Sequence, residues 1–108
     1  MAFADNLKQL PGVSHLAAIE LLDESGARAA LIEHKTGQIG SLTVYNHLAQ
    51  FYGHINAEAA TRGLELYAEH TDDARANPGK HPNIDRLLQI LATGQALGVR
   101  HVFAGVAD

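Results

Sequence analysis

The stretch that decides the fold is residues 15–34, HLAAIELLDESGARAALIEH. Two apolar runs, 15–22 and 27–34, flank the tetrapeptide Asp23-Glu24-Ser25-Gly26, and a glycine at the end of a three-residue loop is typical of a β-hairpin. If Asp23 pairs with Ala27, the register places Leu21 opposite Ala29 and Ile19 opposite Leu31, on a face that we expect to be buried.

The second face of this predicted hairpin is also partly apolar, since it would carry Leu16, Leu22 and Ile32. Exposed apolar patches of several hundred Å² usually mark an interface. The pattern therefore predicts either a homodimer through this face or its coverage by the first helix.

Apolar residues at helical spacing predict four helices around the hairpin. The first spans residues 3–10. The second follows Ser41 as N-cap and ends at Gly53, the third follows Asn56 and carries one stripe from Ala60 to Ala74, and the last follows Asn83. Gly63 inside the third helix indicates close packing against another element. In the last helix we expect Ile84, Leu87, Leu88 and Leu91 to face inward.

Residues 99–103 predict a third strand, after a helix end at Gly94 or Gly98. The predicted fold is α+β: a small, mainly antiparallel sheet, made of the hairpin and a C-terminal strand, packed by three to four helices. No linker divides residues 1–108, so we expect a single domain.

Composition excludes several classes of protein. With 8 Lys and Arg, 12 Asp and Glu and a net charge of −4, the chain lacks the basic face of a nucleic-acid binder. No Cys is present, which excludes disulfides and thiolate metal sites, and no apolar run approaches the roughly 18 residues of a membrane span. The first residues do not resemble a signal peptide. We expect a cytoplasmic protein that uses no cofactor.

Residues 70–86, HTDDARANPGKHPNIDR, form the polar corner of the chain, a helix, a turn and the start of a second helix. Pro78 and Gly79 suit a turn, and Asn83 suits a cap. The remaining polar side chains have no structural role that the sequence reveals, and loops held by rigid turns often bind ligands. The candidate binding residues are His70, Asp73, Lys80, His81 and Asp85.

The chain has seven His, roughly three times ordinary usage. None forms a close metal-binding pair, although His70 and Asp73 share a helix face and His81 could return across the turn. We expect no metal; if one is bound, His70, Asp73 and His81 are its predicted ligands.

The loop 37–41, GQIGS, could present backbone N–H groups to an anion at the start of a helix. It lacks the lysine of a phosphate loop, so an ordinary strand-to-helix connection is the favoured interpretation.

Three segments carry a resemblance: Gly40–Tyr45 (GSLTVY), Leu66–Thr71 (LYAEHT) and Asn77–Leu87 (NPGKHPNIDRL). Together they resemble a family of small bacterial proteins of unknown function, over nearly the whole chain. The resemblance implies a bacterial protein and brings no activity, cofactor or catalytic residue with it.

Two hypotheses of function follow. The first is a non-enzymatic binding or protein-interaction module whose partner is a small molecule or a protein, with a homodimer as a further expectation. The second is a small metal-dependent enzyme with ligands His70, Asp73 and His81, and Asp85 as its base.

Overall fold

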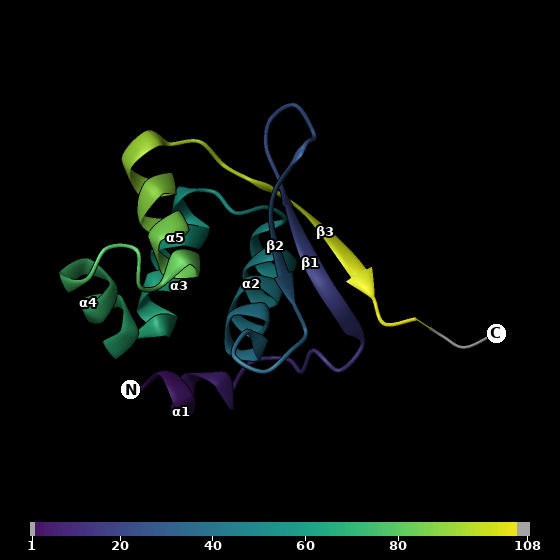
Figure 1. Ribbon diagram of the computed structural model, residues 1–108, viewed down its shortest axis with the longest axis horizontal. Helices are drawn as coiled ribbons and strands as arrows, with labels where there is room; N and C mark the ends of the chain where they lie inside the picture. The colour runs from purple at the N-terminus through teal and green to yellow at the C-terminus, as the bar shows by residue number, and fades with distance from the viewer. Residues whose placement is uncertain (1, 106–108) are drawn as a thin grey trace.

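A computed structural model describes residues 2–105. Its sheet has three strands, β1 (Leu16–Leu22), β2 (Arg28–Glu33) and β3 (Gly98–Phe103), in the order β2-β1-β3 with both pairs antiparallel (Figure 1). The predicted hairpin and the C-terminal strand are therefore confirmed. That residues 1–108 form one domain stays a prediction, and residues 1 and 106–108 lie outside the described part.

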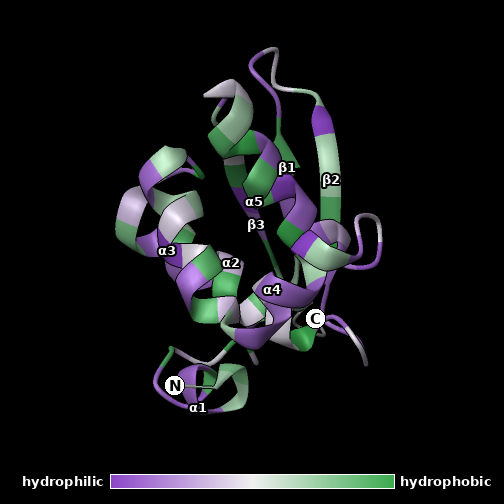
Figure 2. Cartoon of the chain, turned by 90° about the vertical axis from the view of Figure 1, so that its left-hand side faces the viewer, coloured by the Kyte–Doolittle hydropathy of each residue, from purple (hydrophilic) through white to green (hydrophobic). Residues whose placement is uncertain are grey.

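Between residues 2 and 105, five helices accompany the sheet: α1 (Phe3–Leu7), α2 (Ile39–Tyr52), α3 (Ala57–Tyr67), α4 (Glu69–Ala76) and α5 (Pro82–Thr93). They lie on one side of the sheet, with α2 packed on β1 and β2, α3 packed on α2, and α5 on α3 (Figure 1). The helices carry both hydrophobic and hydrophilic residues, as helices packed on one side do, and α1 lies below α2, α3 and α4 (Figure 2). The fold is α+β, as predicted.

The hairpin register differs from the prediction by one residue. The pairing Asp23–Ala27 is present, but Leu22 pairs with Arg28 while Leu21 pairs with Ala30 and Ile19 with Ile32. Ala29 is thus the extra residue of a β-bulge, which exchanges the faces of all residues after it. Ile32 is consequently fully buried, whereas Leu31 is 38% exposed.

This bulge overturns the predicted apolar second face. Leu16 and Ile32 both belong to the core, and Leu22 alone of the three is half-buried. On the outer face Glu20 lies between two arginines, 2.7 Å from Arg100 and 3.6 Å from Arg28. The first helix does not cover this face, because α1 packs on α3 and α2.

Two predicted helix caps are wrong. Helix α2 begins at Ile39 after Gln38, not after Ser41, and α5 begins at Pro82 after His81, not after Asn83. Proline lacks the N–H that a cap would satisfy and has its φ preset, so Pro82 suits the first helical position. The predicted Asn56 cap is confirmed: its side-chain oxygen accepts from the N–H of Ala59 at 2.8 Å.

Other helix boundaries and faces are partly as predicted. Gly53 and Gly94 end α2 and α5 in the left-handed conformation, as expected. The first helix ends at Leu7 instead of residue 10. In α5 the inward residues are Ile84, Leu87 and Ile90, while Leu88 is half-buried and Leu91 is 41% exposed.

The close packing predicted at Gly63 is present. A Cβ at this position would lie 2.7 Å from Leu87 Cδ1 of α5 and 2.9 Å from Leu48 Cδ1 of α2. Both distances are shorter than van der Waals contact, so three helices meet where α3 has no side chain.

The predicted long third helix is in fact two helices, because the chain breaks at Ala68. Ala68 has φ 51° and ψ −116°, the one positive φ among the described non-glycine residues. The stripe through Ala60, Leu64 and Tyr67 stays on α3, while Ala74 belongs to α4. The break therefore accounts for five helices in place of four.

We predict that Ala68→Gly stabilises the protein. Glycine adopts a positive φ without the steric cost that alanine pays, which is on the order of 1–3 kcal/mol for such conformations. After the larger backbone entropy of glycine in the unfolded chain is subtracted, a gain of about 1 kcal/mol should remain in denaturant melts. The matched control is Ala92→Gly in the exposed last turn of α5, where the cost of glycine should be at most about 1 kcal/mol. A similar loss in both variants would contradict the strain at Ala68.

Candidate functional site

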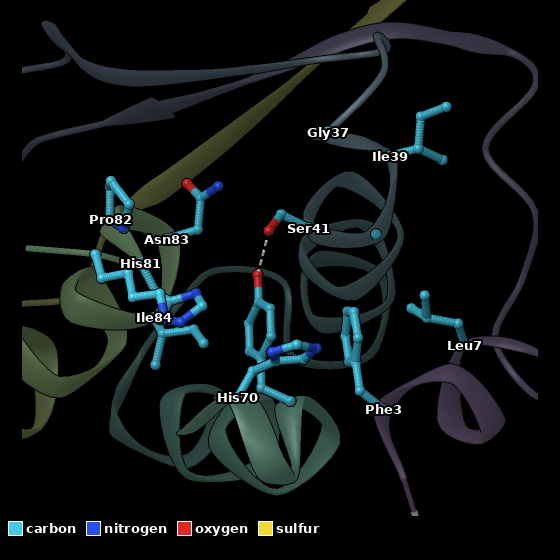
Figure 3. A pocket seen from close by; sticks show the side chains of 13 residues that line it. Phe3, Leu7, Gly37, Ile39, Ser41, His70, His81, Pro82, Asn83 and Ile84 are labelled. Carbon is cyan, nitrogen blue, oxygen red and sulfur yellow. Dashed lines mark hydrogen bonds between the residues drawn. The ribbon is translucent and has the colours of Figure 1, made fainter. Parts of the chain in front are cut away.

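A cavity of about 460 Å³ lies where the N-terminus, the start of α2, the end of α3, α4 and the start of α5 meet (Figure 3). We call it the corner cavity. It is lined by Phe3, Leu7, Gly37, Ile39, Gly40, Ser41, Tyr67, His70, Lys80, His81, Pro82, Asn83 and Ile84.

One wall of the corner cavity is aromatic. The rings of Phe3 and Tyr67 are stacked with centroids 5.2 Å apart, and the His70 ring meets Phe3 edge-on with centroids 5.0 Å apart.

Helix α1 is held in place by two hydrogen bonds: the N–H of Phe3 donates to Glu69 at 2.8 Å, and Asn6 donates to the carbonyl of Leu66 at 2.9 Å. A short helix with no buried residue of its own is thereby fixed as a wall.

Phe3 fits against α2 because residue 40 is a glycine. A Cβ at Gly40 would lie 3.1 Å from Phe3 Cζ, closer than ordinary carbon contacts. The glycine therefore lets the Phe3 ring approach the first turn of α2.

A pair of hydroxyl groups lies in the middle of the cavity wall. The Tyr67 hydroxyl donates to Ser41 Oγ at 2.6 Å, the bond drawn as a dashed line in Figure 3. Burial raises the pKa of the Tyr67 hydroxyl well above its ordinary value, so this group keeps its proton. No described residue accepts the proton of the Ser41 hydroxyl, so this group keeps a free hydrogen-bond donor.

A second tyrosine ties the starts of α2 and α5 together. The buried Tyr45 hydroxyl donates to the carbonyl of Asn83 at 2.5 Å, and burial raises its pKa to about 12. The Arg86 guanidinium donates to the Asn83 side-chain oxygen at 2.8 Å and lies 3.3 Å from the Tyr45 hydroxyl. Asn83 thus has a structural role, though not the predicted cap.

Asp73 organises the turn that forms the opposite wall. Its Oδ2 atom lies 2.6 Å from His81 Nε2 and 2.9 Å from Lys80 Nζ. Since an ionised carboxylate only accepts, Nε2 of His81 carries the proton. The hydrogen bonds from His81 and from Lys80 lower the pKa of Asp73 to about 2.

Asp85 supports the same turn from its other side. Its Oδ2 accepts from the N–H of Gly79 at 2.9 Å, and Gly79 has the positive φ of 93° predicted for it. The turn Asn77–Lys80 is closed by a hydrogen bond from Lys80 N–H to the Asn77 carbonyl at 3.1 Å.

The structure brings all five predicted binding residues to one corner but divides their roles. His70, Lys80 and His81 line the cavity, whereas Asp73 and Asp85 are not part of the lining and hold the turn. Asp73, Lys80, His81 and Asp85 thus make contacts within the turn that the sequence did not reveal.

The predicted metal ligands His70, Asp73 and His81 lie near one another but are not arranged as a metal site. The rings of His70 and His81 have centroids 5.7 Å apart, and the Asp73 carboxylate is bonded to His81 and Lys80. Within residues 2–105 no three His, Asp or Glu side chains are grouped so that they could hold a metal ion.

Sequence reasoning missed the contribution of Phe3, Tyr67 and the loop 37–41. The sequence favours an ordinary connection for the loop, and no local pattern shows that α1 returns to the start of α2. The one signal was Gly40, whose conformation is helical and whose lack of a side chain is needed for the contact with Phe3.

Two other hollows are larger but have less convergent chemistry. One, of about 700 Å³, lies between the hairpin turn and residues 94–97, and the other, of about 530 Å³, lies between α3, α4 and Leu91. The first is lined by Asp23 and Glu24, and neither combines aromatic rings with basic groups. The corner cavity is therefore the better candidate.

Comparison with known proteins agrees with the resemblance carried by the three segments. The model of a family described as an uncharacterised protein conserved in bacteria (DUF2322) matches residues 3–101. The chain belongs to this family. The matched range includes every residue that lines the corner cavity. No curated protein and no solved structure matches the chain. None of the described helices has the length and apolar character needed to cross a membrane.

We predict that Asp73→Asn lowers stability at pH 7 and that this loss shrinks in acid. Asp73 has a lower pKa in the folded chain, about 2, than in the unfolded chain, where it is about 3.9. Its ionised form therefore favours folding above pH 4, and this contribution disappears as the pH falls from about 4 to about 2.

Denaturant melts of wild type and variant at several pH values measure the difference. The matched control is Asp72→Asn on the same helix, an exposed side chain, which should change stability at pH 7 by less than about 0.5 kcal/mol. A loss for Asp73→Asn that is the same at pH 7 and pH 2 would contradict the role of the carboxylate charge.

Proposed function

We propose that this protein is a non-enzymatic binding module that holds a small molecule in the corner cavity. Its volume, about 460 Å³, lies in the range of roughly 300–1,000 Å³ that is usual for small-molecule sites. Such sites combine apolar and aromatic walls with a few convergent polar groups, as Phe3, Tyr67 and Ser41 do here. The convergence of five chain segments on this cavity is the observation that carries the proposal.

The hydrogen bonding of the polar groups supports binding over catalysis. An activated serine needs a base within hydrogen-bond reach. The partner of Ser41 is instead the Tyr67 hydroxyl, which donates and has a raised pKa. The Asp73 carboxylate is likewise occupied by His81 and Lys80. The donors left for a ligand are the Ser41 hydroxyl and the remaining N–H groups of Lys80.

A fragment titration followed by NMR tests this proposal. The panel contains phenyl, indole and naphthalene compounds, each as a carboxylate, a phosphate and a neutral alcohol. We expect members of the panel to shift the amide signals of residues 37–41, 67–70 and 80–84. Ile39→Trp, which places a larger ring at the cavity wall, should weaken this binding at least fivefold.

The matched control is Leu91→Trp, because Leu91 on α5 is 41% exposed, Ile39 is 42% exposed, and Leu91 lies outside the lining. It should leave fragment binding unchanged. A panel in which no fragment shifts the cavity amides up to its solubility limit would refute the proposal, as would equal effects of the two tryptophans.

The alternative is the small metal-dependent enzyme, with His70, Asp73 and His81 as ligands and Asp85 as base. A metal that binds the native state raises the melting temperature by mass action. We expect Zn²⁺ and Mn²⁺ to give no such rise, because a metal would have to displace Lys80 and His81 from Asp73. A rise that is lost in His70→Ala and kept in His54→Ala, a variant of an exposed histidine, would favour the enzyme instead.

A homodimer, a protein partner and residence in the cytoplasm stay predictions of the sequence. The argument for a dimer no longer rests on Leu16 and Ile32, which are core residues. Its remaining support is the sheet itself, since β2 and β3 are edge strands whose outer backbone groups could pair with another strand.

A further inference from the structure

The lining of the corner cavity has an unusual charge composition for this chain. The chain has 12 acidic and 8 basic residues and a net charge of −4. The lining nevertheless contains one Lys, Lys80, two imidazoles, those of His70 and His81, and no Asp or Glu. A cavity lined by a cationic side chain and by no carboxylate, in a chain with an excess of acidic residues, points to a ligand of negative charge.

Two carboxylates outside the lining contact residues of the lining. Asp73 accepts from Lys80 and His81, and Glu69 accepts from the backbone N–H of Phe3. The His70 ring packs against Phe3 and His81. The Lys80 side chain is 60% exposed, so its ammonium group keeps N–H donors for a second acceptor.

Neutral donors in the cavity suit the same kind of ligand. The Ser41 hydroxyl accepts from Tyr67, and its own proton is left to donate. Ser41 and Gly40 also lie in the first turn of α2, where backbone N–H groups lack partners within the helix. Gln38 does not cap this turn, because its side-chain oxygen accepts from the N–H of Glu33 at 2.7 Å.

The start of α5 lies in the same lining and also favours an anionic ligand. Its cap residue, His81, makes no capping hydrogen bond with its side chain. Because a helix N-terminus carries a positive partial charge, both helix ends strengthen the preference for an anion that the basic side chains establish.

The other wall defines the rest of the ligand. The stacked rings of Phe3 and Tyr67, with Leu7 and Ile39, make an apolar surface beside the donors. Figure 3 shows Phe3 and Leu7 on one side of Ser41, with His81 and Asn83 on the other. A molecule that fills this space presents an apolar body to the first wall and an acceptor group to the second.

We infer that the ligand of the corner cavity is a small amphipathic oxyanion, with a carboxylate or phosphate head toward Ser41 and the basic side chains and an apolar body against Phe3 and Tyr67. This inference rests on the proposed function and specifies the chemical class of its ligand. Carboxylate and phosphate share the recognition by N–H and O–H donors, and the experiment distinguishes them.

The test measures the affinities of 1-naphthoate, 1-naphthyl phosphate and 1-naphthalenemethanol by isothermal titration calorimetry and NMR. All three have the same apolar body and differ in the head. We expect at least one of the two anions to bind tenfold or more tightly than the neutral alcohol, and the tighter anion identifies the head group. This advantage should fall as salt is added, since screening weakens charge interactions.

Lys80→Met tests the charge directly, because it keeps much of the length of the side chain and removes the ammonium group. It should remove most of the advantage of the anion and leave the affinity for the alcohol unchanged. The matched control is Arg62→Met, which removes the same charge from an ion-paired, 48% exposed side chain on α3 outside the lining. It should preserve the advantage, and thermal melts check that both variants are folded.

The outcomes separate the two proposals. If the alcohol binds in the cavity as tightly as both anions, the oxyanion inference fails and the proposed function stands. If Arg62→Met weakens anion binding as much as Lys80→Met, the attraction is that of the whole chain and the inference also fails. If no fragment of the panel binds in the cavity, the proposed function itself fails.

Discussion

The arrangement of the helices depends on the close approach at Gly63. Leu48 of α2 and Leu87 of α5 both reach the point on α3 that a side chain would otherwise occupy. Both leucines are fully buried, as are Ile19, Leu21 and Ile32 on the sheet beneath α2. A larger residue at position 63 would force these helices apart, because protein cores are packed too tightly to absorb even one methyl group without strain.

This approach also determines where the corner cavity lies. Tyr67 follows Gly63 by four residues and is therefore on the same face of α3, one turn further along. The starts of α2 and α5 meet beside it, held by the bond from Tyr45 to the Asn83 carbonyl. Helix α1 then closes the remaining side through Phe3. The cavity is thus built mainly from the ends of helices, where side chains and backbone donors are both available.

Two local features place the polar side chains at this site. The break at Ala68 separates α4 from α3, and His70 follows it directly in the first turn of α4. The turn at Gly79 brings Lys80 and His81 back to Asp73. Positive φ angles are found on both sides of the site, at Ala68 and at Gly79, and only the one at Ala68 is strained, since glycine adopts a positive φ at little cost. Rigid turns of this kind hold ligand groups in place before the ligand arrives, and this lowers the entropy lost on binding.

The sequence by itself determined the features that depend on neighbouring residues. Turn chemistry predicted the hairpin at Asp23–Gly26, the glycines that end α2 and α5 and the turn at Gly79, since only glycine adopts a positive φ at little cost. Apolar spacing predicted most of the helices and the α+β class. The tertiary structure decided the bulge at Ala29. The bulge turns Ile32 instead of Leu31 into the core, and this choice depends on the packing of α2 against the sheet. The tertiary structure likewise decided the break at Ala68 and the return of Phe3 to Tyr67, 64 positions along the chain. The corner cavity belongs to this second group, because its walls come from five segments of the chain that the packing of the helices brings together.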